Sequence, residues 1–178
     1  MKNLFQRYSV ILTIALVIVF FDQWTKSLVR ANIAPGATWL PESQAWLSPY
    51  ARIVHWYNTG AAFGMFKDAS MVFTVLAFIV IGAIIFYYPQ VEQNDWALRL
   101  ALSMQLGGAI GNLIDRIRIG HVTDFISVGN FPVFNIADAS ISTGAAVLFL
   151  GVLIQERAER RAKANLAASE AAGENNLE

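Results

Sequence analysis

The sequence predicts an all-α membrane protein, a four-transmembrane-helix bundle that carries a small extracytoplasmic β-rich cradle. Of the 178 residues, 56% are hydrophobic and 15% are charged, whereas soluble domains carry about 45–50% apolar and about 25% charged residues. Four segments approach the roughly 20 apolar residues that a helix needs to cross a bilayer. A long stretch between the first two segments is instead rich in aromatic and turn residues, which favours a small layer of strands.

The predicted spans cover about residues 8–29, 70–88, 96–114 and 137–154. The first span begins like a signal peptide, because Lys2 and Arg7 precede the apolar run "VILTIALVIVFF". However, the bulky and charged residues "DQWTKSLVR" follow this run at once, and no cleavage site of small residues ends it. We therefore expect the first span to be retained as a membrane helix.

The loop between the first two spans, about residues 31–69, contains prolines, a glycine-rich end and three tryptophans. Short extended runs such as "RIVHWY" predict that it forms a β-rich layer on the outer membrane surface. The last stretch, residues 161–178, is small and polar, which predicts a flexible tail. Residues 1–160 would then form a single membrane-embedded domain.

Basic residues near the span ends predict the orientation of the bundle. Four spans place both termini on one side, and the residues flanking them there include Lys2, Arg7, Arg157, Arg160, Arg161 and Lys163. The opposite side also holds basic residues, so the C-terminal cluster decides the orientation. We expect both termini in the cytoplasm and the two longer connections on the outer face.

Most of the unusual polar residues fall at the outer end of this bundle. They are Asp22 and Lys26 in span one, Asn58 in the first outer loop, Asn112, Asp115 and Arg116 at the end of span three, Asp124 in the second outer loop, and Asn135 with Asp138 at the start of span four. Each also has a structural interpretation. Asp22 with Lys26 is spaced as a helical ion pair, and Asp115 with Arg116 could anchor the end of span three. Asp138 fits a cap of span four, which leaves Asp124 unexplained.

The composition excludes several classes of function. The chain carries 13 basic and 13 acidic residues, so it lacks the basic footprint of a nucleic-acid-binding protein. It has no cysteine, which excludes disulfides, thiolate catalysis and cysteine metal sites. His55 and His121 have no partners at metal-ligand spacing. We therefore expect neither a metal site nor a cofactor.

Asp124 and Asp138 are candidates for a catalytic pair. Two carboxylates that share a site cannot both ionise cheaply, so one keeps a proton while the other is anionic. Such a pair supplies a general base that activates water and a general acid that protonates a leaving group. Spacing alone leaves two interpretations open, an intramembrane catalytic dyad and a proton relay.

Four segments resemble the conserved boxes of the lipoprotein signal peptidase family, also called signal peptidase II. They are "DQWTK", "YNTGAAFG", "GNLIDRIRIGHVTDFI" and "FPVFNIADASI", in the order that the family has them. The resemblance covers nearly the whole chain except the C-terminal tail. It implies an aspartyl protease of the bacterial inner membrane. Such an enzyme cuts the signal peptide from a prolipoprotein just before a cysteine that carries diacylglycerol, and residues 1–160 would be its protease domain.

The resemblance also implies roles for individual residues. Asp124 of "VTDFI" and Asp138 of "NIAD" would be catalytic. The substrate pocket would be shaped by Asn58, Asn112, Arg116 and Asn135, and the site would be supported by Asp22, Lys26 and Asp115. The implied partners are diacylglyceryl-modified prolipoproteins and membrane lipids. Globomycin, the family's cyclic-peptide inhibitor, would occupy the aspartate pair, and we expect a monomer.

Two other classes of function remain as alternatives. A small proton-coupled transporter could use the same carboxylates as a relay, but it predicts ionisable groups near the bilayer midplane. A non-catalytic scaffold would explain the glycines and the aromatic loop but would leave the aspartate pair without a purpose.

Overall fold

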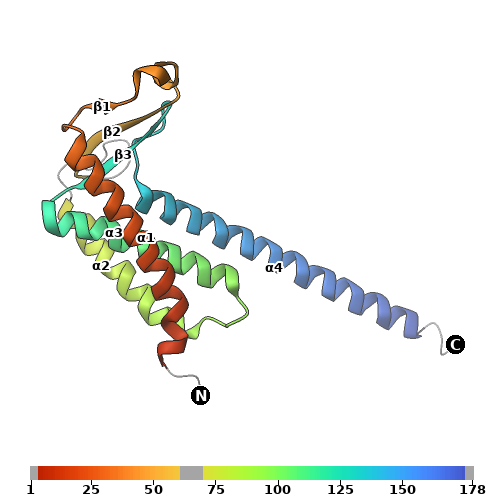
Figure 1. The fold of residues 1–178 in the computed structure, drawn as a ribbon. Helices are drawn as coiled ribbons and strands as arrows, with labels where there is room; N and C mark the ends of the chain where they lie inside the picture. Colours follow the sequence, from red (N-terminus) through yellow and green to blue (C-terminus); the bar gives the residue numbers. More distant parts are fainter. Residues whose placement is uncertain (1–3, 61–69, 175–178) are drawn as a thin grey trace.

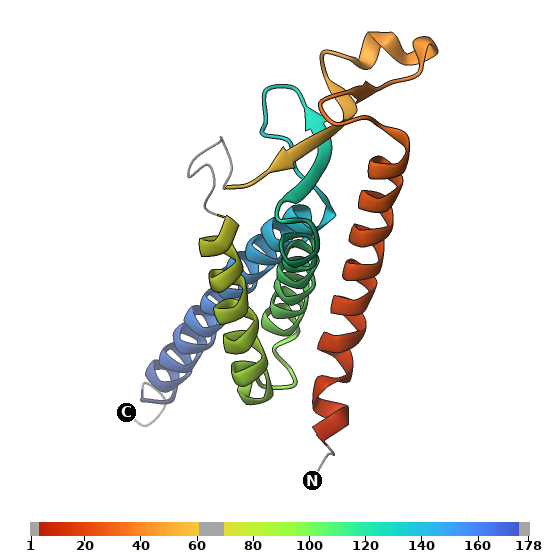
Figure 2. The same ribbon diagram turned by 90° about the vertical axis from the view of Figure 1, so that its left-hand side faces the viewer.

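The computed structural model describes residues 4–60 and 70–174, and the helices within these ranges form a bundle with a small sheet at one end (Figures 1 and 2). The four long helices are α1 Leu4–Asn32, α2 Ser70–Tyr87, α3 Trp96–Ile119 and α4 Ile136–Glu174. Each has a segment long and apolar enough to cross a membrane. The beginning of α1 and the end of α4 both lie away from the sheet (Figure 2). This arrangement agrees with the predicted four spans and their up-and-down order.

The helix α3 is the centre of the bundle. It packs against all three other long helices, and 56% of its most apolar window is buried, compared with 6–17% for the others. The outer helices expose many large apolar side chains, such as Phe20, Phe78 and Phe149. These faces suit a lipid environment, because the hydrocarbon core of a bilayer solvates apolar side chains.

Both ends of α3 carry the expected capping groups. The side chain of Asp95 accepts a hydrogen bond from the Leu98 N–H at 3.0 Å, and the helix ends at Gly120, whose φ of 80° is left-handed. The helix therefore continues beyond the predicted end of span three at about residue 114. The apolar run ends at the charged residues Asp115 and Arg116, but the helix continues to Ile119.

The helix α4 runs without interruption to Glu174, whereas the sequence predicts a flexible tail from residue 161. Alanine, glutamate, arginine and lysine dominate this stretch, and these residues favour helix even where they are exposed. An exposed ion pair between Glu156 and Arg160 also links successive turns just before it. The division of the chain into a domain and a tail at residue 160 stays a prediction.

The sheet has three antiparallel strands in the order β1-β2-β3. They are β1 Thr38–Trp39, β2 Ala51–Asn58 and β3 Val122–Val128, with the short 3-10 helix η1 Glu42–Leu47 between β1 and β2 and a second, η3 Tyr88–Gln90, after α2. The run "RIVHWY" is extended as predicted. The sequence predicts the sheet within residues 31–69, but its third strand comes from the connection between α3 and α4. Residues 61–69 of the predicted cradle lie outside the described residues.

Small residues on α3, in the run "GGAIG" of residues 107–111, let the neighbouring helices approach closely. A Cβ atom on Gly107 would lie 2.9 Å from the Cβ of Ile18 on α1. A Cβ atom on Gly108 would lie 2.5 Å from the carbonyl oxygen of Ala137, in the first turn of α4.

Replacing Gly108 with alanine is therefore expected to push α3 and α4 apart. Because the clash is with backbone, it cannot be relieved by a rotamer change, and we expect a loss of about 1–3 kcal/mol in stability. Thermal unfolding of the purified variant measures this. The matched control is Gly82→Ala on α2, where an added Cβ meets nothing within 4 Å. An equal unfolding temperature for both variants would contradict the close contact.

Candidate active site

Asp124 is placed by the central part of β3, opposite Trp56 of β2. Alternate residues of a strand face the same side, so Asp124 shares a face with Val122 and with Asn58 on the neighbouring strand. The carboxylate is only 1% exposed. It accepts hydrogen bonds from the Asn58 amide at 2.8 Å and from the Asn135 amide at 2.7 Å.

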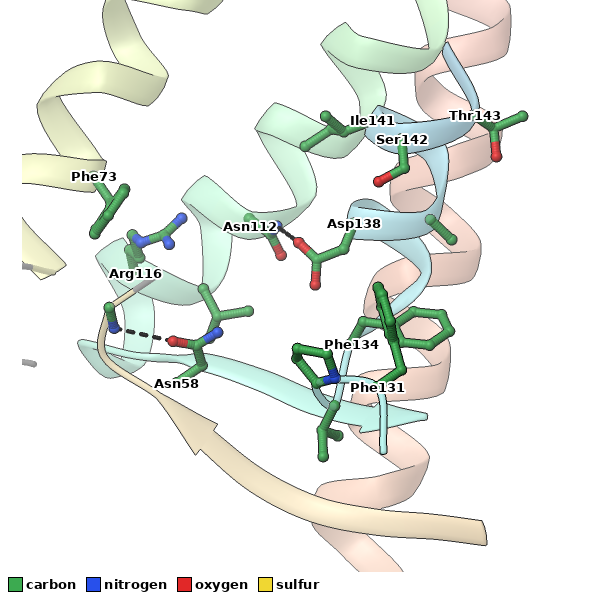
Figure 3. Close-up of a pocket in the computed structure, with 15 residues that line it drawn as sticks. Asn58, Phe73, Asn112, Arg116, Phe131, Phe134, Asp138, Ile141, Ser142 and Thr143 are labelled. Atoms are coloured by element: carbon green, nitrogen blue, oxygen red, sulfur yellow. Dashed lines mark hydrogen bonds between the residues drawn. The ribbon is translucent and has the colours of Figure 1, made fainter. Parts of the chain in front are cut away.

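Asp138 lies in the first turn of α4 and forms a reciprocal capping box with Asn135. The Asn135 side-chain oxygen accepts the Asp138 N–H at 2.9 Å, and the Asp138 carboxylate accepts the Asn135 N–H at 3.2 Å. The cap interpretation of Asp138 is thus half correct, because Asn135 occupies the cap position. The other carboxylate oxygen of Asp138 accepts the Asn112 amide at 2.8 Å (Figure 3).

Asn135 joins the two aspartates, because its backbone N–H binds Asp138 while its side-chain amide binds Asp124. The same amide donates to the side-chain oxygen of Asn112 at 3.1 Å. The three predicted asparagines therefore surround the aspartate pair, and each donates at least one hydrogen bond to a carboxylate. Their predicted contact with substrate stays a prediction.

A buried ion cluster lies beside the aspartates, formed by Asp22, Lys26, Arg30 and Asp115. The Lys26 ammonium is 2.9 Å from Asp22 and 3.3 Å from Asp115, and its side chain is fully buried. It also donates to the side-chain oxygen of Asn112 at 3.0 Å, which connects the cluster to Asp138. The other oxygen of Asp22 accepts the Ala137 N–H at 3.0 Å, so α1 also holds the start of α4.

Asp115 and Arg116, which the sequence offered as one possible anchor of the end of span three, face different helices. Asp115 points toward α1, where it meets Lys26 and Arg30 at 3.3 Å each. Adjacent helical residues point in directions about 100° apart, so Arg116 faces α2 instead and lies 5.4 Å from the centre of the Phe73 ring. Its Nε is buried without a hydrogen-bond partner among the described residues.

A pocket of about 530 Å³ opens beside Asp138. One side is polar, with Asn58, Asn112 and Arg116 pointing toward the same space as Asp138 (Figure 3). Most of the rest is apolar and is formed by Phe73, Val122, Phe131, Pro132, Val133, Phe134, Ala139 and Ile141, and Gly60, Ser142 and Thr143 complete the wall. The space can therefore receive a molecule that has both a polar and an apolar part.

Burial raises the pKa of the Asp124 carboxyl to about 7, and the nearby carboxylate of Asp138 adds to this effect. The hydrogen bonds from Asn58 and Asn135 and the charge of Lys26 oppose the shift. A carboxyl group with such a pKa can hold a proton near neutral pH and still release it.

The chain matches the model of a known protein family. The model described as "Signal peptidase (SPase) II" matches residues 14–154, which include the ion cluster, both aspartates and all four predicted pocket residues. The chain belongs to the signal peptidase II family.

Individual members of the family align with this chain over nearly their whole length. The lipoprotein signal peptidase of Halalkalibacterium halodurans is 38% identical over 154 residues, which cover 84% of this chain and 96% of that protein. The enzyme of that name from Shouchella clausii is 40% identical and covers 83% and 95%. A solved structure described as a bacterial membrane enzyme is 29% identical, with a TM-score of 0.74 over 82% of this chain and 88% of the other. This signal peptidase II is therefore a multi-pass bacterial membrane hydrolase.

Three residues of the site, Gln23, Arg30 and Thr123, are not among the residues predicted from the motifs and spacing of the sequence. Gln23 donates to Asp22, to the Gly111 carbonyl and to Asp115. Arg30 and Thr123 bind each other at 3.0 Å. The helical spacing of Asp22, Lys26 and Arg30, four residues apart, is a signal that could have found Arg30. Thr123 carries no such signal, because its partners come from α1 and α3.

The family assignment does not favour the transporter alternative for this signal peptidase II. The ionisable groups also lie together at the sheet end of the bundle, where α1 ends and α4 begins, rather than along its length.

Proposed function

We propose that this signal peptidase II is an aspartyl endopeptidase that removes signal peptides from diacylglyceryl-modified prolipoproteins, cleaving just before the lipidated cysteine. The observation that carries the proposal is the bridging of Asp124 and Asp138 by Asn135 at the wall of a pocket. The names of the relatives supply the substrate class, since they are lipoprotein signal peptidases.

The chemistry follows from two carboxyl groups that share one proton. The anionic carboxylate takes a proton from a water molecule as the oxygen of that water attacks the scissile carbonyl carbon. The protonated partner donates to the carbonyl oxygen, which gives a tetrahedral intermediate with two hydroxyl groups on the carbon. As this intermediate collapses and its C–N bond breaks, the carboxyl that took the proton from water gives it to the leaving amine, and the other carboxylate takes a proton back from a hydroxyl group. The amides of Asn58, Asn112 and Asn135 fix the carboxylates, so that little reorganisation is needed during the reaction.

The charges of the site support one shared proton. The acids of the site are the buried Asp22, Asp115 and Asp124 and the partly buried Asp138, and the cations around them are Lys26, Arg30 and Arg116. Four carboxylates against three cations leave one negative charge. One proton on the aspartate pair removes it, and this neutral state costs the least where carboxylates are largely removed from bulk water.

The two sides of the pocket support a lipidated peptide as substrate. The polar side, with Asn112 and Arg116, can bind peptide carbonyl groups, and the apolar side, with Phe73 and Ile141, can hold acyl chains. Membrane lipids would fill the same apolar space in the resting enzyme. Globomycin is expected to occupy the pocket against the aspartate pair.

The proposal includes a location in the bacterial inner membrane, with both termini in the cytoplasm and the sheet on the outer face. The arginines near the end of α4, such as Arg157 and Arg161, favour the cytoplasmic side. All groups of the site come from one chain, so a monomer suffices for activity.

The direct test uses the purified chain in lipid nanodiscs and a prolipoprotein with or without diacylglycerol on its cysteine. We expect cleavage of the lipidated precursor, a product that begins with the lipidated cysteine by mass spectrometry, and inhibition by globomycin. Equal cleavage of the unmodified precursor, or no cleavage of either, would overturn the proposal.

The raised pKa of Asp124 predicts how the rate of cleavage depends on pH. A group with a pKa of about 7 is protonated below that pH and ionised above it, so the shared proton is lost as the pH rises through about 7. We therefore expect kcat/KM, which reports the pKa values of the free enzyme, to fall on the alkaline side. The measurement is kcat/KM on both sides of pH 7, with thermal unfolding at each pH as the control for folding. A kcat/KM that rises steadily across this range would contradict the role of the shared proton.

A further inference from the structure

We infer that Arg30 and Thr123 are positioning residues that hold the catalytic strand β3 against α1 and thereby fix Asp124. The inference rests on the proposed function, because it assigns these residues a part in the reaction of the aspartate pair. Arg30 lies outside the four segments that resemble the family, and Thr123 lies within one of them without an implied role. Their contact joins the membrane bundle to the sheet.

Thr123 precedes Asp124 directly, and all of its polar groups bind elements other than the neighbouring strand. Its N–H donates to Asp115 of α3 at 3.0 Å, and its hydroxyl oxygen accepts from Arg30 of α1 at 3.0 Å. Its carbonyl is 3.5 Å from the Asn135 amide. Thr123 is completely buried, so these contacts are not exchanged for water. The position of the Asp124 backbone is therefore set by the helices as well as by the sheet.

Arg30 is the member of the ion cluster that reaches the sheet. One nitrogen of its guanidinium is 3.3 Å from Asp115 of α3 and 3.0 Å from the Thr123 hydroxyl of β3, so it binds the helix and the strand at once. The side chain is 26% exposed, and α1 ends only two residues later. A planar guanidinium can serve two acceptors from one fixed position, which a lysine ammonium on a flexible stem does less well.

Arg30 also balances charge next to the aspartate pair. Asp22 and Asp115 carry two negative charges, and Lys26 and Arg30 carry two positive ones. The charged groups around Asp124 come from three helices: Asp22, Lys26 and Arg30 from α1, Asp115 and Arg116 from α3, and Asp138 from α4. The two histidines are His55 on β2 and His121 just before β3. Loss of the Arg30 charge leaves one extra negative charge near Asp124, which makes its ionisation more costly.

Four variants separate the effect of the Arg30–Thr123 hydrogen bond from the effect of the Arg30 charge. Arg30→Gln removes both, Arg30→Lys restores the charge only, and Thr123→Val removes the hydroxyl acceptor while it keeps the backbone N–H. Arg118→Gln is the matched control, because this exposed arginine lies near the end of α3 on the same side of the bundle.

For Arg30→Gln we expect kcat to fall about tenfold or more at an unchanged KM, and the alkaline limb of the pH profile to move to higher pH. Arg30→Lys should return the pH profile to that of the wild type but recover kcat only in part. Thr123→Val should lower kcat severalfold without moving the pH profile. Hydrogen–deuterium exchange gives a readout independent of cleavage, and residues 122–128 should exchange faster in Arg30→Gln and in Thr123→Val than in Arg118→Gln.

The outcomes distinguish this inference from the proposed function. If the wild type does not cleave the lipidated precursor, the proposed function fails, and the exchange of β3 alone decides whether Arg30 holds the strand. If the wild type cleaves and Arg30→Gln and Thr123→Val match Arg118→Gln in kcat, pH profile and exchange, the inference is wrong. A lower unfolding temperature with unchanged kcat would make Arg30 merely structural. Should Arg30→Gln fail to fold, Arg30→Lys and Thr123→Val carry the same test.

Discussion

Replacing Asp124 or Asp138 with asparagine is expected to lower the kcat for prolipoprotein cleavage by about 10²–10⁴-fold or more, the range that a general acid or base contributes. Asparagine has the shape of aspartate but cannot exchange a proton at neutral pH. In each position its side-chain oxygen can still accept one of the two hydrogen bonds that the carboxylate accepts now, from Asn58 or Asn135 at Asp124. The variants should therefore fold and remain in the membrane.

The measurement is single-turnover cleavage by each purified variant, with thermal unfolding as the check on folding. Asp95→Asn is the matched control, because asparagine caps a helix as well as aspartate does and Asp95 caps α3 at the opposite end of the bundle. A folded Asp124→Asn or Asp138→Asn enzyme with near-wild-type kcat would show that this aspartate is structural.

Replacing Lys26 with methionine is expected to cost the most stability of any single change in the bundle, about 3–5 kcal/mol. Methionine fills a similar volume, but Asp22 and Asp115 then share a buried site with Arg30 alone. The side chains of Lys26 and Asp22 are both completely buried, so water cannot solvate the unpaired charge. Thermal or denaturant-induced unfolding in detergent measures the loss.

Two further variants show whether charge is the cause. The double variant Asp22→Asn with Lys26→Met restores neutrality and should recover part of the lost stability. Arg160→Gln breaks an ion pair of the same i, i+4 spacing, but its side chains are 77% and 52% exposed, and we expect no measurable loss of stability there. A similar unfolding temperature for Lys26→Met and Arg160→Gln would show that the buried ion pair does not stabilise the bundle more than the exposed one.

Hydropathy and helical spacing were enough to predict the four helices and the end of the bundle where the polar residues gather. Both signals are local: apolar runs of sufficient length become spans, and residues three or four positions apart share a face. The extended run "RIVHWY" was equally readable. Asp124 was placed in a loop, however, since β3 is a strand only because β2 pairs with it, and that pairing joins segments far apart in the chain.

The partners of Asp115 could not be predicted for the same reason. Its sequence neighbour Arg116 was the obvious cation, yet the direction of each side chain depends on which helix packs on which face of α3. The α1–α3 contact turns Asp115 toward Lys26 and leaves Arg116 to the pocket. The length of α4 was underestimated for a different reason, because the small and polar residues after the fourth span are also helix-forming residues.

The spacing of Asp22 and Lys26 within one helix also has a consequence for biogenesis. The two residues can pair as soon as α1 is helical, before any later segment has left the ribosome. During co-translational insertion, Asp22 therefore neutralises Lys26 within α1, whereas Arg30 has no carboxylate partner until α3 is present. Asp115 arrives on α3 and completes the neutralisation. Insertion of the third helix is thus the step at which Arg30 gains its carboxylate partner, and it precedes the delivery of Asp124 and Asp138.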